Sequence, residues 1–255
     1  MDRRKFLDVA ARAAAAAAWA GSLDAGAKLP GGAPAPSGAP AGAGPEAGTS
    51  RPKLIIPTDI PDRFKVKVME FNPVPPIDSA AWQLEIGGLA GRPLKLKLAD
   101  IKRLPSVKQS SRMKCVQCWS ARIDWEGFRS GELLSLARPK PGANWVRLDC
   151  ADMYYDYLKM EELLHPKTLF ALAMNGEPLT PEHGAPMRLV MPFKYGYKSS
   201  KLITKITLTD KGGQGVVADT WPYYSQTGDI EPGYDHPFDF PGQTRKIKGG
   251  EITDY

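Results

Sequence analysis

Two cysteines with the spacing C-x-x-C, Cys115 and Cys118, lie in the segment SRMKCVQCWSARIDW. Such a pair can act as a redox couple, because the second thiol resolves a mixed disulfide. It can also supply half of a zinc site, although Cys150 and the three scattered histidines offer no second pair at zinc-finger spacing. A buried structural cysteine or a simple disulfide is a third interpretation. In a fourth, one thiolate binds a redox-active metal, and a cofactor must then complete the coordination sphere.

A second element with binding chemistry lies in residues 175–210. The stretch EHGAPMR places His183 and Arg188 around a glycine and a proline, and YGYKSSK is a glycine-containing loop that leads into a strand. That loop contributes Lys198, Ser199, Ser200 and Lys201. Phosphate groups bind to cationic side chains, hydroxyls and backbone amides that glycine leaves approachable. Each residue alone is more typical of a solvated surface, but the set suits a large anionic organic cofactor.

Together, the two elements resemble the sulfite-oxidase-type molybdopterin oxidoreductases over about residues 64–210. RMKCVQCWS is similar to the segment that carries the molybdenum cysteine in that family. The pattern G-x-P-L-x-x-E-H-G-A-P-x-R-L-x-x-P-x-x-Y-G-x-K-S-x-K is similar to its pterin-binding signature. The nearer resemblance is to the exported bacterial reductase catalytic subunits, including the periplasmic methionine-sulfoxide reductases. In these the cysteine is also followed by V-x-x-W-S and W-x-G-F, matched here by Trp125, Gly127 and Phe128.

The resemblance implies a role for particular residues of this chain. Cys115 is the expected molybdenum ligand, and Cys118 falls where the relatives have no ligand. Tyr154, or its neighbour Tyr155, falls near a tyrosine that faces the metal, so Tyr154 is a second catalytic candidate. The implied cofactor-binding residues are Asn72, Cys150, His183, Arg188, Ser199, Ser200 and Lys201. Among them His183 and Arg188 are expected to hold the pterin phosphate, and Cys150 stands where the reductases have a threonine.

Departures from the family pattern bear on the substrate. In sulfite oxidases a Gly-Asn-Arg-Arg type run follows the ligand cysteine, whereas here residues 116–119 are Val-Gln-Cys-Trp. An Arg-Asn-His run before Pro-Val-Pro is also replaced, and only Asn72 can stand in for a cofactor contact there. Loss of the arginines argues against sulfite, because a dianion in a desolvated pocket needs paired cationic donors. Trp119 and Trp125 suggest an aromatic pocket for a thioether-like or neutral substrate.

The implied activity is two-electron oxygen-atom transfer at a molybdenum–molybdopterin cofactor, in the direction that reduces S- or N-oxides such as methionine sulfoxide. Sulfite dehydrogenase-type oxidation and a non-catalytic binding module are the alternatives. No C-x-x-C-H haem motif is present, since Trp119 follows Cys118. We therefore expect a separate electron-transfer partner, either a membrane haem subunit or a soluble cytochrome, and a small-molecule or oxidised-protein substrate.

The N-terminus has the layout of an export signal. Arg3 and Arg4 precede an alanine-rich apolar run, and residues 25–27 form an A-x-A cleavage pattern. We expect a twin-arginine signal peptide at residues 1–27, a periplasmic location, and no stable membrane insertion after cleavage. Residues 28–50 are rich in proline, glycine and alanine and are expected to form a linker. A catalytic domain is expected at residues 51–215, followed by an aromatic, turn-rich extension at 216–255.

Hydrophobic periodicity predicts the α+β class, rich in strands with peripheral helices. The expected strands cover residues 63–71, 82–88, 93–97, 144–152, 186–196 and 202–210. Short helices are expected near residues 98–104, 127–137 and 159–166, and Asn175-Gly176 predicts a hairpin turn. The formal net charge is +6. Because no dense stripe of Lys and Arg with interleaved aromatics accompanies it, nucleic acid is not an expected partner.

Overall fold

The computed structural model describes residues 65–116, 119–235, 245–246 and 251–255. All of them belong to one compact unit, which extends from Lys53 to Tyr255. The expected signal peptide, the expected linker and Cys118 lie outside the described residues. No helix in the described part of the chain is long and apolar enough to cross a bilayer.

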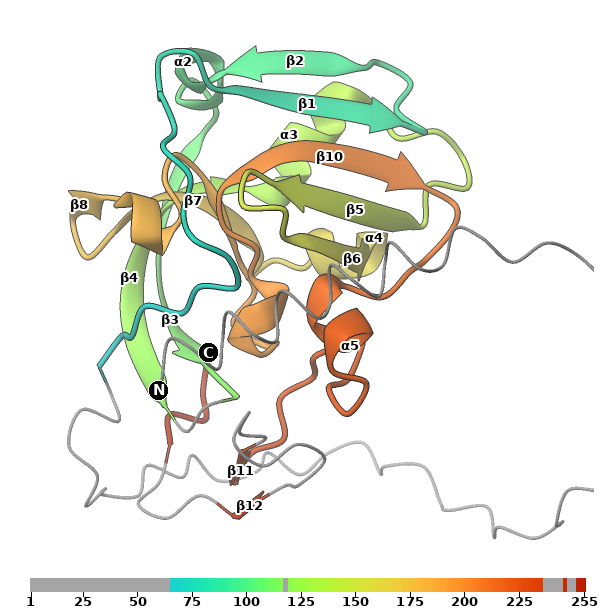
Figure 1. Cartoon of the computed structure of the whole chain (residues 1–255). Helices are drawn as coiled ribbons and strands as arrows, with labels where there is room; N and C mark the ends of the chain where they lie inside the picture. The colour runs from blue at the N-terminus through green and yellow to red at the C-terminus, as the bar shows by residue number, and fades with distance from the viewer. Residues whose placement is uncertain (1–64, 117–118, 236–244, 247–250) are drawn as a thin grey trace, which may run out of the picture. The chain divides into compact units, whose positions relative to one another are not determined.

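The first sheet contains five strands in the order β2-β1-β10-β5-β6 (Figure 1). These strands are β1 (Gln83–Gly88), β2 (Leu94–Lys97), β5 (Trp145–Cys150), β6 (Tyr155–Lys159) and β10 (Ile203–Thr209). β1 pairs in parallel with β10, and the other neighbours are antiparallel. In β1 and β5 the buried and more exposed residues alternate. One face of this sheet is therefore packed on the protein interior, and the other is partly exposed.

The second sheet is built on a long hairpin. β3 (Ser106–Lys114) pairs with β4 (Ser120–Arg129), in a register that places Lys114 opposite Ser120. β4 pairs with β7 (Leu169–Met174), which in turn pairs with β8 (Glu177–Pro178) and β9 (Arg188–Val190). The predicted turn at Asn175-Gly176 joins β7 to β8, and both residues have positive φ values of 51° and 85°. That conformation suits the tight turn of a two-residue hairpin.

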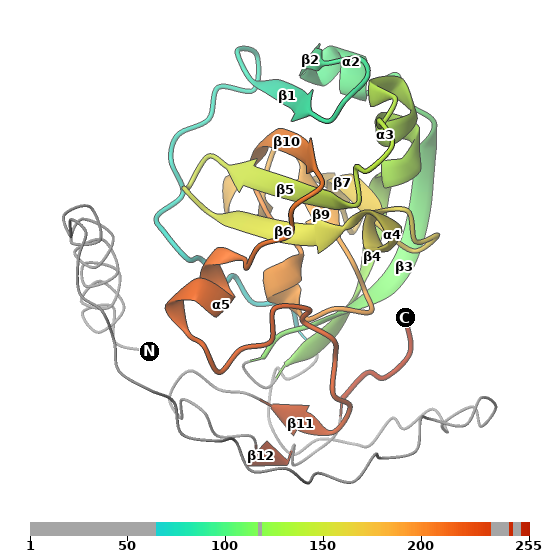
Figure 2. The same cartoon turned by 90° about the vertical axis from the view of Figure 1, so that its right-hand side faces the viewer.

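The helices are short. They are α2 (Leu98–Ile101), α3 (Ser130–Ala137), α4 (Met160–Leu163) and α5 (Val216–Thr220), with 3₁₀ turns η1 (Pro181–His183) and η2 (Gly196–Lys198). The remaining strands are β11 (Tyr234–Asp235) and β12 (Arg245–Lys246). Figure 2 shows α3 and α4 on the side of the first sheet that faces the β3–β4 hairpin.

Two hydrophobic cores lie on opposite faces of the second sheet. Phe128, Phe170 and Leu189 join the first core, where they meet the buried face of the first sheet and helix α3. Leu169, Ala171 and Val190, which adjoin Phe170 and Leu189 in sequence, belong to the second core, which also holds Cys115 and residues of α5. Because side chains alternate between the faces of a strand, a strand buried on both faces has to be apolar throughout. The sequence LFALAM of β7 meets that requirement.

The strand-rich α+β class and most of the expected strands are confirmed. The strand expected at residues 63–71 is wrong for its described part, because residues 65–71 form no strand. Val66, Met69 and Phe71 pack against the second core instead. The helix expected at 127–137 begins only at Ser130, because the residues before it complete β4.

Candidate functional site

Three of the segments that carry predicted site residues meet the stretch 195–203. The end of β3 bridges to it between Lys114 and Tyr195. From β9, the Leu189 amide donates to the Ser200 carbonyl over 2.8 Å. From the end of β5, the amide of residue 151 donates to the carbonyl of residue 202 over 2.9 Å. Stretch 195–203 therefore brings the cysteine hairpin, the arginine strand and the β5–β6 turn together.

Arg188 is a buried cation at the centre of this arrangement. Its Nη1 donates to the His183 carbonyl over 3.0 Å, and its Nη2 lies 3.7 Å from the Met113 sulfur. The guanidinium also lies over the Trp125 ring, 5.1 Å from the centroid. Within the described residues it forms no ion pair with a carboxylate, and its Nε has no hydrogen-bond partner. Burial lowers the pKa of Arg188 to about 10, so it remains charged at neutral pH.

Arg188 and Lys201 both lie close against Gly184, which has no side chain. A Cβ at this glycine would lie 3.0 Å from the Lys201 Cβ and 3.1 Å from the Arg188 Cβ, and its φ is +104°. The Lys201 Nζ donates to the Met69 carbonyl over 2.8 Å and to the Glu182 carbonyl over 2.6 Å. Burial, and then the Arg188 charge, lowers the pKa of Lys201 to about 8.

His183 adjoins the same pair of cations. Burial, followed by the charges of Arg188 and Lys201, lowers its pKa below the usual range. A neutral imidazole beside two cations can still donate a hydrogen bond to an anion without adding charge. His183, Arg188 and Lys201 thus form a cationic corner in which Arg188 has no anionic partner among the described residues.

Cys115 follows directly after β3 and is buried in the second core. Its amide donates to the Trp119 carbonyl over 3.0 Å, which continues the β3–β4 pairing by one residue. Residues two apart in an extended segment point to the same face, so Cys115 shares a face with Met113. Since Met113 contacts Arg188, the cysteine and the cationic corner lie on one side of the hairpin.

The β5–β6 turn forms another edge of the site. Asn72 donates from its Nδ2 to the Asp152 carbonyl over 2.7 Å, and the Asp152 carboxylate accepts from the Tyr154 amide over 3.2 Å. The Tyr154 hydroxyl donates to the Tyr197 carbonyl. Cys150 carries a free, buried thiol. Burial, and then nearby carboxylates led by Asp152, raises its pKa.

The two predicted serines differ in their contacts. The Ser199 hydroxyl accepts a hydrogen bond from the Met191 amide over 3.2 Å and so ties the loop to β9. The Ser200 hydroxyl is buried and has no hydrogen-bond partner in the described chain. Arg188 Nε and Ser200 Oγ are thus buried polar atoms that a bound anionic cofactor could satisfy. The residues present fit such a group.

Other predicted residues lie elsewhere. The Tyr155 hydroxyl donates to an Asp219 carboxylate oxygen over 2.5 Å, so its hydroxyl is directed at α5. Trp119 and Trp125 are 5% and 1% exposed and belong to the second core. Both are core residues, and this burial does not support the aromatic substrate pocket suggested by the sequence.

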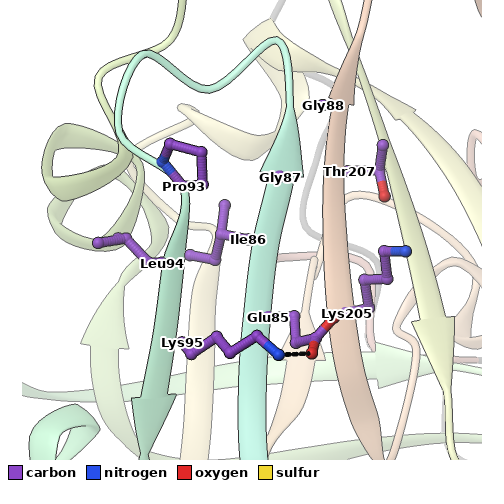
Figure 3. A pocket seen from close by; sticks show the side chains of 9 residues that line it. All are labelled: Glu85, Ile86, Gly87, Gly88, Pro93, Leu94, Lys95, Lys205 and Thr207. Carbon is purple, nitrogen blue, oxygen red and sulfur yellow. Dashed lines mark ion pairs between the residues drawn. The ribbon is translucent and has the colours of Figure 1, made fainter.

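A hollow on the first sheet is unrelated to this site. It is lined by residues of β1, β2 and β10 on the partly exposed face (Figure 3). Lys95 and Glu85 form an ion pair across it at 2.8 Å, and both side chains are well exposed. None of the predicted site residues lines it.

Two residues of the site were not predicted from the sequence. Met113 could have been found from its position two residues before Cys115 in an extended segment. Gly184 could have been suspected from its place between two turn-forming stretches, but its contacts with Arg188 and Lys201 depend on the tertiary fold. Among the described residues, no group of three or more His, Cys, Asp or Glu side chains is placed to hold a metal ion.

Comparison with known proteins agrees with the geometry. Residues 71–217 match the oxidoreductase molybdopterin binding domain. The chain is 33% identical over 178 residues to the catalytic subunit of protein-methionine-sulfoxide reductase from Campylobacter jejuni, covering 61% of this chain and 59% of the relative. It is 34% identical over 189 residues to that subunit from Gluconobacter oxydans, covering 66% of this chain and 58% of the relative. The chain thus spans less than two thirds of the length of either relative.

The fold has a solved counterpart. The sulfane dehydrogenase SoxCD from Paracoccus pantotrophus superposes with a TM-score of 0.53 and 23% identity, over 68% of this chain and 46% of that one. The predicted sulfite-oxidase-type fold and the predicted molybdenum–molybdopterin cofactor are confirmed. The chain belongs to the family of oxidoreductases with a molybdopterin-binding domain.

Proposed function

We propose that the chain is the catalytic subunit of an exported reductase that removes oxygen from S- or N-oxides, with methionine sulfoxide as the leading substrate. The observation that carries this proposal is the buried Arg188. It has no carboxylate partner in the described chain, and it touches Met113 on the strand that leads to Cys115. A buried cation without an anion is costly, so this position is suited to a cofactor phosphate.

In this proposal, His183, Arg188 and Lys201 bind the cofactor phosphate, and Cys115 supplies a thiolate ligand to molybdenum. Ser199, Ser200, Asn72 and Cys150 surround the pterin through backbone and side-chain contacts. The contact between Met113 and Arg188 supports placing the thiolate and the phosphate anchor on the same face of the hairpin. The printed names of the two methionine-sulfoxide reductase relatives support the choice of substrate.

The bound cofactor would exchange two electrons and an oxygen atom with the substrate. Reduction of a sulfoxide consumes two electrons and two protons and yields a thioether and water. The chain's own residues orient the substrate, exclude water and supply hydrogen-bond donors near the oxygen that leaves. Tyr154 is the proposed donor, and its hydroxyl would exchange its bond to the Tyr197 carbonyl for one to the substrate oxygen. Burial, and then the Asp156 carboxylate, raises its pKa well above the usual range, so its phenol stays protonated.

Electrons for this reaction come from a separate partner, a membrane haem subunit or a soluble cytochrome. Export by the twin-arginine route to the periplasm completes the proposal, and the paired Arg3 and Arg4 support it.

The test compares two cysteine variants of the full-length protein made in a host that synthesises molybdopterin. Cys115→Ser is expected to lose metal and activity, because serine does not replace a soft thiolate on molybdenum. Cys118→Ser, three positions away, is the matched control and is expected to keep most of both. Molybdenum content is measured by elemental analysis. Activity is measured with a reduced dye and methionine sulfoxide, and separately with ferricyanide and sulfite.

Each arm of the test has an outcome against the proposal. Full molybdenum content in Cys115→Ser would remove the proposed ligand. Turnover with ferricyanide and sulfite, without turnover of methionine sulfoxide, would assign the oxidising direction instead. Molybdenum-free protein from the competent host would favour a binding module that keeps only the scaffold.

A further inference from the structure

The last five described residues, 251–255, contact the β3–β4 hairpin and are here called the C-terminal tail. Figure 1 shows the C-terminus beside the end of β3. The Ile252 amide donates to the Ser120 Oγ over 2.9 Å, and Asp254 forms an ion pair with Arg122 at 2.9 Å. Arg112 donates to the carbonyls of Ile252 and Thr253. The tail is therefore joined to both strands near the turn that carries Cys115.

The tail and the cofactor site use opposite faces of the hairpin. Directly opposed residues of an antiparallel pair share a face, and the register pairs Arg112 with Arg122 and Lys114 with Ser120. The tail contacts all four. Met113 and Cys115 alternate with Arg112 and Lys114 along the chain, so they lie on the other face, where Met113 contacts Arg188.

The most buried of these contacts involves the residue next to the cysteine. The Lys114 ammonium forms an ion pair with the Glu251 carboxylate, and the two side chains are 1% and 6% exposed. The other carboxylate oxygen of Glu251 accepts from the Gly233 amide over 2.7 Å. Lys114 also bridges by its backbone to Tyr195, at the start of the stretch on which the site converges. Loss of one member of a buried ion pair leaves an uncompensated charge, so the strand end must move or hydrate.

We propose that Glu251 is a positioning residue for Cys115. Its carboxylate holds Lys114 from the back of the hairpin and so fixes the end of β3 with the Cys115 thiol directed at the cofactor. The tail also offsets the repulsion between Arg112 and Arg122, which lie opposite each other across the strands. This inference deepens the proposed function and rests on ligation of the metal by Cys115.

The experiment measures Cys115 directly. Full-length protein is prepared without cofactor, in a Cys118→Ser background, and alkylation of Cys115 is followed by peptide mass spectrometry. Glu251→Ala is expected to speed alkylation about tenfold or more, because a thiol that is 8% exposed reacts through local opening. Glu177→Ala, at an exposed glutamate of β8, is the matched control and is expected to leave the rate unchanged. Glu251→Gln keeps the shape but only one of the two acceptor oxygens and no charge, and its rate is expected to fall between the two.

A second measurement uses the cofactor-loaded protein. The electron paramagnetic resonance spectrum of its metal is expected to change in Glu251→Ala and to stay as in the wild type in Glu177→Ala. Wild-type alkylation and an unchanged spectrum, with only a lower Tm, would assign Glu251 a merely structural role and overturn the inference. If Glu251→Ala does not fold, Glu251→Gln decides, and a wild-type alkylation rate in it overturns the inference. The alkylation result does not depend on metal. A failure of the positioning role is therefore distinguishable from a failure of metal ligation by Cys115, which the Cys115→Ser variant tests.

Discussion

Replacement of Gly184 by alanine tests the cationic corner without removing any charge. Gly184 has φ +104°, and a Cβ there would lie 3.0 Å and 3.1 Å from the Cβ atoms of Lys201 and Arg188. These contacts are tighter than ordinary van der Waals contact, so the neighbours must give by a few tenths of an ångström. The two cations that we assign to the cofactor phosphate would then move apart.

A control variant separates the cost of backbone strain from the effect of the close contacts at Gly184. Gly176 has φ +85° and no atom within 4 Å of its would-be Cβ, so Gly176→Ala introduces backbone strain alone. For an L-residue that strain is about 1–2 kcal/mol, which corresponds to roughly 2–8 °C in Tm for a domain of this size. Both variants should lose about this much stability.

The affinity for the cofactor should distinguish the two variants. A hydrogen bond to a charged group contributes about 1.5–3 kcal/mol, so weakening one by about half costs about 1 kcal/mol, or roughly a fivefold rise in Kd. We therefore expect Gly184→Ala, but not Gly176→Ala, to lose molybdenum on dialysis, measured as the ratio of metal to protein. Equal ratios in the two variants would refute the assignment of Arg188 and Lys201 as the phosphate anchor.

Two further predictions follow from the charges of the site. Binding of the cofactor should weaken as pH rises through about 8, because Lys201 has its pKa lowered to about 8 and a bound phosphate favours its protonated form. Metal retention measured between pH 7 and pH 9 should show this loss. The Lys201→Arg variant, which stays charged, should abolish the pH dependence. An identical pH profile in the wild type and the variant would contradict the role of Lys201. Asp156→Asn should lower the free energy of unfolding by about 3–5 kcal/mol, because the Lys198 ammonium, buried 2.5 Å from that carboxylate, loses its partner. Denaturant unfolding measures this loss. The double variant Lys198→Met with Asp156→Asn should recover most of it. A loss below about 1 kcal/mol in the single variant would contradict the expected cost of leaving the buried Lys198 unpaired.

Strands with one exposed face were predictable from the sequence. In β1, Leu84 and Ile86 are buried while their neighbours are more exposed, so the alternation is visible along the chain. The same alternation was misleading at Val66 and Val68, where none of the described strands pairs with the chain and Val68 is 47% exposed. Periodicity reports the exposure of alternate side chains, whereas a strand also needs a backbone partner. β7 was missed because burial on both faces removes the alternation.

The candidate site was predictable where a local motif carries it. The loop YGYKSSK and the stretch EHGAPMR indicated phosphate chemistry, and the fold brings Arg188 and Lys201 together through Gly184. The contact of Lys114 with Glu251 could not be foreseen, because the two residues are 137 positions apart and a single charged residue has many potential partners. The difference between Tyr154 and Tyr155 was equally hidden, since only the tertiary fold directs one hydroxyl to Tyr197 and the other to α5.

The central position of β10 in the first sheet ties its assembly to the order of synthesis. β1 near the start of the domain pairs in parallel with β10, so that Glu85 lies opposite Lys205, 120 positions further along the chain. Until the ribosome has passed residue 209, β1 and β5 have no strand to join them. Such distant pairing is slow, because a long loop must close before the contact forms. β10 also continues directly from the stretch 195–203, which meets the strand of Arg188 and the β5–β6 turn. Insertion of β10 into the first sheet and assembly of the cofactor-binding residues therefore depend on the same segment of chain.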